Sequence, residues 1–413
     1  MKEFFFAICL LSSIIAFTQP GPQISTQGAL VLDQFLQSKT TSGQVPGIVA
    51  LVLNKEKVIY KSASGFSRIS TKESMAADKI FSIASMTKAV TTVAAMQLIE
   101  QGKIDLNDPV SKYLPAMGSI QVIEKFNPKD TSYSLRSPAR PITIRDLLTH
   151  TSGSGYSFDD KTLALISQKK PAIAPSPHTG YPLIHDPGAR WTYGMNTNLL
   201  GEVIEKVSGL SLVQYFDANI FKPLGIDDTS FIVPEAKYSR LARSYTRINN
   251  KLEEQVGFEK RKPAISGGNG LYSTAGDYAI FLRMLLNKGA LNGKRIVSEK
   301  SVTAMTQNQI GDLFVNTLPG TFPRLALDFP ERSGKDKFGF GFVIRTASEN
   351  EPNTRKPGSY SWAGIFNTHY WVDPQTGIAV VFLMQVLPFY DPGCMEALDG
   401  FERVVYGNLD EGK

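Results

Sequence analysis

The chain has 413 residues, of which 42% are hydrophobic and 20% charged, and its formal net charge is +6. This length is enough for one large domain or two closely built ones with a sizeable core, and the composition excludes a disordered chain. The basic residues are scattered, whereas nucleic-acid binding usually requires a concentrated basic stripe with interleaved aromatic residues. We therefore expect a globular protein that does not bind nucleic acid.

The first residues have the pattern of a secretory signal. Lys2 precedes a run of apolar and small residues from Phe4 to Phe17. Such a run is too short to cross a bilayer comfortably, and it resembles the h-region of a signal peptide. A membrane anchor is the alternative. We predict a signal peptide at residues 1–18 and export to the periplasm or out of the cell, which leaves no stable membrane span in the mature chain.

The next elements are a helix, a hairpin and a second helix. Residues 30–39 place apolar side chains on one helix face, and residues 47–67 contain two β-branched runs around a polar turn, which is typical of a hairpin. The first of these runs is apolar on both faces and should be a buried strand. From Ser85 to Gln101, apolar residues recur at three- and four-residue steps, which predicts a helix that stops at Gly102.

The middle of the chain favours helices separated by long loops. Residues 141–150 and 198–209 have the clearest helical patterns. Residues 115–141 are long and irregular, as are residues 155–190 around a proline-rich stretch. Because long ordered loops in compact enzymes often shape a substrate site, we expect these two loops to form the pocket.

The last third returns to strands. Residues 273–289 predict a helix capped by Ser273 or Thr274, and the chain closes with a predicted helix at 394–409. Between them lie three runs that are rich in β-branched and aromatic residues, at 338–346, 359–374 and 375–385.

Strands at both chain ends and helices between them predict an α+β fold. The simplest architecture is an antiparallel sheet built from both ends of the chain, flanked by helices and carrying an inserted, mostly helical domain. We assign residues 19–84 and 266–413 to the sheet domain and residues 85–265 to the helical domain. A cleft between the two parts is the expected site.

Ser85 and Lys88 are the strongest candidates for chemistry. Residues three apart share a helix face, so the hydroxyl and the amine can meet. A serine hydroxyl becomes a good nucleophile only when a base takes its proton, and lysine is a base only when neutral. Burial lowers the pKa of lysine and makes this possible. The flanking apolar residues supply such surroundings: Ile83, Met86, Ala89 and Val90.

Several stretches in order resemble the serine hydrolases of the β-lactamase and penicillin-binding-protein superfamily. They extend over residues 28–405 and include FSIASMTKAV, PITIRDLLTHTSG, DPGARWTYG, FKPLGIDDTSF and GGNGLYSTAGDY. The resemblance implies that fold, with Ser85 as nucleophile, Lys88 as its lysine and Tyr193 as the tyrosine that completes the proton relay. Either Lys88 or Tyr193 can be the base, and the two can titrate as one coupled unit.

The resemblance also assigns a substrate-binding strand. Penicillin-recognising members have Lys-Thr-Gly on that strand, whereas this chain has Trp362, Ala363 and Gly364, as in the family VIII carboxylesterases. The backbone N–H groups of Ser85 and Ile365 would form the oxyanion hole.

Two departures bear on the substrate. Many β-lactamases of this superfamily have asparagine two residues after the relay tyrosine, where this chain has Met195, and the lysine that would hold a carboxylate is replaced by Trp362. Both changes argue against efficient recognition of β-lactams or D-Ala-D-Ala. The sequence therefore predicts a serine hydrolase that cleaves small-molecule carboxylic esters without a cofactor.

Other functions stay open. The same site could serve a D-amino-acid peptidase, a weak β-lactamase or a penicillin sensor of little activity. A Ser-His-Asp triad is disfavoured because no G-x-S-x-G elbow is present, and no motif with metal-ligand spacing occurs. Of the histidines, His150 is expected to be structural and His185 to lie in a loop near the cleft.

Overall fold

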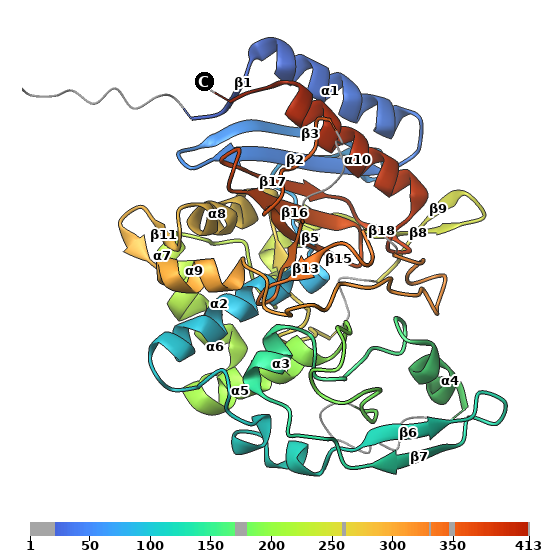
Figure 1. Ribbon diagram of the computed structural model, residues 1–413. Coiled ribbons are helices and arrows are strands. Elements are labelled where there is room, and N and C mark those ends of the chain that lie inside the picture. Colours follow the sequence, from blue (N-terminus) through green and yellow to red (C-terminus); the bar gives the residue numbers. More distant parts are fainter. Residues whose placement is uncertain (1–20, 170–179, 258–261, 330–331, 347–351, 412–413) are drawn as a thin grey trace, which may run out of the picture.

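An eight-stranded antiparallel sheet joins the two ends of the chain (Figure 1). The computed structural model describes residues 21–169, 180–257, 262–329, 332–346 and 352–411. The proposed signal peptide therefore lies outside the described residues. In spatial order the strands are β13 (Lys337–Phe338), β14 (Val343–Ile344), β15 (Tyr360–Gly364), β16 (Thr368–Asp373), β17 (Ile378–Leu383), β2 (Gly47–Asn54), β3 (Val58–Arg68) and β4 (Glu73–Ser74).

The centre of the sheet is buried on both faces because β2 is apolar at nearly every position. All eight residues of β2 are buried, and the strand pairs with β17 in a register that sets Val52 beside Val380. Alternate residues face two separate cores. Ile48 and Val52 lie in the core beneath α1 (Thr26–Thr41) and α10 (Pro392–Gly407).

The opposite face carries the core that reaches the helical part of the chain. Val49 and Leu51 of β2 pack there with α8 (Ala275–Leu286) and α2 (Thr87–Glu100). Helices α1 and α10 lie side by side over one face, and the helices below the sheet are on the other (Figure 1). The predicted α+β architecture is thus confirmed, whereas the domain division at residues 85 and 266 stays a prediction.

The other described elements are short or peripheral. The remaining helices are α3 (Ile144–Leu148), α4 (Lys161–Lys169), α5 (Asn196–Ser208), α6 (Leu212–Phe216), α7 (Lys222–Leu224) and α9 (Glu299–Met305). The remaining strands are β1 (Gln23–Ile24) with β19 (Leu409–Asp410), β5 (Phe81–Ser82) with β10 (Tyr272–Ser273), β6 (Val122–Phe126) with β7 (Tyr133–Arg136), β11 (Ala290–Leu291) with β12 (Lys294–Arg295), and β18 (Val386–Leu387) with β8 (Tyr245–Ile248) and β9 (Lys251–Glu254).

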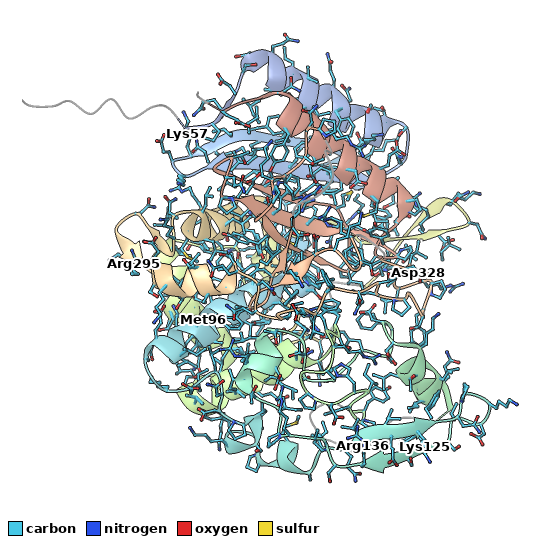
Figure 2. The ribbon with its side chains drawn as sticks, in the orientation of Figure 1. Lys57, Met96, Lys125, Arg136, Arg295 and Asp328 are labelled. Carbon is cyan, nitrogen blue, oxygen red and sulfur yellow. The ribbon has the colours of Figure 1, made fainter. Side chains whose placement is uncertain are left out.

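Helices α1, α2, α3, α5, α8 and α10 form where the sequence pattern predicts them. Thr274 is the cap of α8, since its side chain accepts from the N–H of Asp277. One prediction of irregular structure was wrong in detail. Residues 115–141 contain the β6–β7 hairpin, whose two strands are marked by Lys125 and Arg136 in Figure 2.

The β-rich runs at 338–346 and 359–374 form strands as predicted, and each contains two strands joined by a turn. Gly341 and Asn367 lie at the two turns with φ of +78° and +56°. Glycine and asparagine tolerate this left-handed region better than other residues, so they reverse the chain within an otherwise β-rich run.

A buried carboxylate ties α10 to the rest of the sheet domain. Glu402 is 4% exposed, and its carboxylate pairs with Arg355 at 2.6 Å and lies 4.0 Å from Arg345. The arginine charges hold the pKa of this carboxyl below its usual value, although burial acts in the opposite direction.

Replacing Glu402 by glutamine should lower the free energy of unfolding by about 3 kcal/mol, because two buried guanidinium groups lose their carboxylate. Urea denaturation at pH 7 measures this loss. Glu396→Gln is the matched control, since Glu396 lies on the same helix but forms an exposed pair with Lys39 and should change stability little. Equal effects of the two substitutions would contradict this interpretation.

Candidate active site

Ser85 lies in a 3-10 turn, Ala84–Met86, between β5 and α2. Ala84 has φ of +42°, which is strained for a residue with a Cβ atom and occurs often at functional sites. Several hydrogen bonds hold this turn, and among them Ile83 N donates to Leu271 O and Thr87 Oγ1 donates to Ala84 O at 2.6 Å. Ser85 is thereby fixed at the wall of the main pocket.

Lys88 projects from the first turn of α2 and is 1% exposed. Its Nζ atom lies 2.7 Å from Gly268 O, 3.3 Å from Ser85 Oγ and 3.5 Å from Tyr156 Oη. All three neighbours are uncharged oxygens. Burial lowers the pKa of the Lys88 amine to about 7, although the charge of Asp159 acts against this shift. The predicted contact between the residues at 85 and 88 is therefore present.

Tyr193 reaches the nucleophile from a distant part of the sequence. Its Oη atom donates to Ser85 Oγ at 2.8 Å. Burial raises the pKa of this phenol well above its usual range, and the hydrogen bond to Ser85 opposes the shift only in part. The next residue, Gly194, packs so tightly that a Cβ atom there would lie 1.9 Å from Ser154 O. Only glycine fits this approach, which brings Tyr193 to the pocket.

His150 is buried behind the tyrosine, as predicted for a structural histidine. Asn196 Nδ2 donates to His150 Nδ1 at 3.0 Å, and His150 Nε2 lies 3.3 Å from Thr197 Oγ1. Burial keeps the pKa of His150 well below its usual value, and its ring centroid is 5.3 Å from that of Tyr193. His185 bonds to Thr192 Oγ1 at 2.8 Å in the loop before Tyr193.

The three residues Trp362, Ala363 and Gly364 form the end of β15 and line the same pocket as Ser85. A Cβ atom at position 364 would lie 2.4 Å from Ile83 O, so glycine lets the strand approach the turn that holds the nucleophile. Ile365 also lines the pocket, and its role in the oxyanion hole stays a prediction. The direction of the two N–H groups toward a substrate stays a prediction.

The residues that line the pocket come only in part from the two loops that were expected to form it. Phe158 and Asp159 come from the 155–190 loop, but none of the described lining residues comes from residues 115–141, which was a wrong prediction. The β6–β7 hairpin extends away from the sheet domain (Figure 1). Much of the wall instead comes from the segment 315–329, in which Figure 2 labels Asp328, and it is apolar at Val315, Leu318, Ala326, Leu327 and Phe329.

Sequence reasoning missed three residues at this site. Tyr156, whose Oη donates to Asn198 Oδ1 at 2.7 Å, and Gly268 complete the surroundings of the lysine amine. Asp159 lies in the pocket wall, and burial raises the pKa of its carboxyl to about 7 while the charge of Lys88 opposes the shift. No spacing rule connects these positions to Ser85 because the contacts arise only in the tertiary fold.

The described residues lack two features that would have indicated another function. Among them, no helix combines the length and the apolar character needed to cross a membrane. Within the same ranges, no three His, Cys, Asp or Glu residues are grouped as metal ligands would be.

Comparison with known proteins identifies a family for this chain. The family described as Beta-lactamase matches residues 32–400. The chain is 30% identical to monacolin J acid methylbutanoyltransferase of Aspergillus terreus, over 80% of this chain and 82% of that protein. It is 29% identical to lovastatin esterase of Penicillium rubens, over 86% of this chain and 93% of that protein.

The solved structure of simvastatin synthase from Aspergillus terreus superposes with a TM-score of 0.81 at 26% identity, and the match covers 93% of this chain and 99% of that one. The family match over residues 32–400 confirms the resemblance carried by the sequence motifs. The chain therefore belongs to the beta-lactamase family of serine hydrolases.

Proposed function

We propose that this protein hydrolyses small-molecule carboxylic esters through an acyl-enzyme on Ser85. The observation that carries the proposal is the continuous polar chain from Tyr193 Oη to Ser85 Oγ at 2.8 Å and on to Lys88 Nζ at 3.3 Å. This chain opens into a pocket with largely apolar walls. Nucleophile, base and a further proton carrier within reach of one another are what acyl transfer to serine needs.

Lys88 is the base in this mechanism. A pKa of about 7 leaves much of the amine neutral at physiological pH, whereas the raised pKa of Tyr193 keeps that phenol protonated. A neutral Lys88 donates its two N–H bonds to Gly268 O and Tyr156 Oη. Its lone pair is then free to accept the proton of Ser85, while Tyr193 donates to Ser85 Oγ.

The reaction follows from these positions. Ser85 Oγ attacks the ester carbonyl carbon as its proton passes to Lys88, and the backbone N–H groups of Ser85 and Ile365 stabilise the oxyanion. The alcohol leaves with a proton that Lys88 returns through Tyr193. Water then attacks the acyl-enzyme, gives its proton to the same lysine, and releases the acid and the free Ser85 hydroxyl.

The pocket favours an ester over a substrate with a free carboxylate. Trp362 stands where a lysine would hold such a group, and its ring centroid lies 5.0 Å from that of Tyr193. Two of the arginines in the pocket wall already pair with carboxylates: Arg332 with Asp336 at 2.9 Å and Arg355 with Glu402 at 2.6 Å. These cations are therefore engaged within the fold.

Substitution of Ser85 by alanine should reduce kcat/KM for p-nitrophenyl butyrate by about 10⁴-fold or more, because no acyl-enzyme can form. A fluorophosphonate probe should label the wild type on Ser85 and leave the variant unlabelled. The wild type should prefer the ester to the β-lactam nitrocefin. Wild-type turnover by the variant would refute the mechanism, and a preference for nitrocefin would favour the β-lactamase alternative.

The pH profile should report the ionisation of Lys88. Only the neutral amine accepts the Ser85 proton, so kcat/KM should be full above pH 7 and fall about tenfold per pH unit below it. Asp159 has a similar pKa, and Asp159→Asn separates the two groups. In this variant the acid limb should remain and move to lower pH, since the charge that raises the pKa of Lys88 is gone. Loss of the limb would assign it to Asp159.

Export is part of the same proposal and rests on the apolar run from Phe4 to Phe17. Expression of the full-length chain in a bacterium with a secretory pathway should yield a protein that begins near Gln19 and lies outside the cytoplasm. Intact-mass measurement of the purified protein and cell fractionation test this. An unprocessed chain retained in the membrane would instead support an anchor.

A further inference from the structure

Asp159 brings a carboxylate to the wall of the active-site pocket. It lines the pocket that holds Ser85 and also the adjoining cavity next to Tyr193. The backbone N–H of Asp159 donates to Tyr156 O at 3.2 Å, which fixes the turn, and the side chain is half-buried. Among the residues that the structure describes, none forms a hydrogen bond or an ion pair with this carboxylate.

When Asp159 is ionised, no described ion pair balances its charge. Among the described residues, Lys88 is the cation that acts on the ionisation of Asp159, and Lys88 is neutral when it serves as a base. The adjoining cavity also borders one further acid and one further base, Asp160 and Arg190. An ionised carboxylate that is half-buried without a partner raises the free energy of the protein, and a cation bound in the pocket would lower it.

Aromatic rings complete a surface suited to a cation. Phe158 lines the main pocket and stacks on Tyr156 with ring centroids 4.8 Å apart. Tyr193 borders both spaces, and Trp191 borders the adjoining cavity. Ring faces attract ammonium groups, and quaternary ammonium ligands are commonly bound by a combination of aromatic walls and a carboxylate.

The two spaces suggest where each half of an ester lies. Ser85, Gly364 and Ile365 line only the main pocket, so the carbonyl and the apolar acyl group belong there. The adjoining cavity borders Thr192 and Tyr193, and Tyr193 is the group through which the leaving alcohol receives its proton. The alcohol half therefore points toward the cavity that Asp159 also borders.

From this geometry we infer that the enzyme prefers esters whose alcohol carries an ammonium group, which Asp159 binds. The inference rests on the proposed ester hydrolysis and names its substrate class. The neutralised carboxylate also no longer opposes the loss of the proton from Lys88, so a cationic substrate leaves more of the base in its active form.

A matched pair of esters tests the inference. Butyrylcholine and 3,3-dimethylbutyl butyrate have nearly the same shape and differ in one positive charge. The wild type should favour butyrylcholine by about tenfold or more in kcat/KM. The ratio should increase from pH 6 to pH 8, as Asp159 ionises. Asp159→Asn should bring the ratio close to one.

Asp312→Asn is the charge-matched control, because Asp312 is exposed and is not one of the described lining residues. It should leave the ratio unchanged. A second measurement needs no variant: choline should inhibit wild-type hydrolysis of p-nitrophenyl butyrate more strongly than 3,3-dimethylbutanol does.

The outcomes separate this inference from the proposed function. A ratio near one in the wild type, or an equal loss on both esters in Asp159→Asn, would overturn the inference, since Asp159 would then act only through Lys88. Hydrolysis of the neutral ester through Ser85 would still support the proposed function. Failure on both esters, with no labelling of Ser85, would refute the proposed function itself.

Discussion

The burial of one amine among uncharged oxygens is the interaction on which the rest of this structure depends. An ammonium group in the place of Lys88 would need a counter-ion or water, and the fold supplies three oxygens of Gly268, Ser85 and Tyr156 instead. The amine therefore gives up its proton near neutral pH. A lysine that is a strong cation on most protein surfaces becomes a base because α2 is buried on nearly every side.

The surrounding scaffold holds the amine of Lys88 close to the nucleophile, Ser85. Tyr278 Oη of α8 donates to Met86 O at 3.0 Å, which fixes the turn that holds Ser85. One turn further along α2, Thr91 Oγ1 donates to Gly267 O at 2.7 Å, so the turn that presents Gly268 is bound to the same helix. Nucleophile and base are thus positioned by elements whose own contacts are buried, as a preorganised site requires.

The sequence predicts the parts of this site that depend on local spacing, and it misses those that depend on packing. Ser85 and Lys88 are three residues apart, in the 3-10 turn and the first turn of α2 that follows it, so their contact follows from helical spacing. Tyr193 is found only through its family motif. Asp159 and the pocket wall at 315–329 follow no repeat or cap signal, because loops meet the site through tertiary contacts. The strands at the chain ends were predictable from their β-branched runs, but their turns at Gly341 and Asn367 were not.

Asp159 and Lys88 affect each other's ionisation in the same pocket. An ionised Asp159 raises the pKa of the lysine amine and so removes part of the base, yet it also stabilises the ammonium that forms when Ser85 is deprotonated. With a neutral substrate, the first effect reduces the fraction of neutral Lys88 before acylation, and the second stabilises the ammonium of Lys88 during acylation. A ligand cation bound to the carboxylate offsets both effects, so the ionisation of Lys88 then depends mainly on its burial. The position of Asp159 at the border of both cavities therefore links the charge of a bound substrate to the protonation of the base.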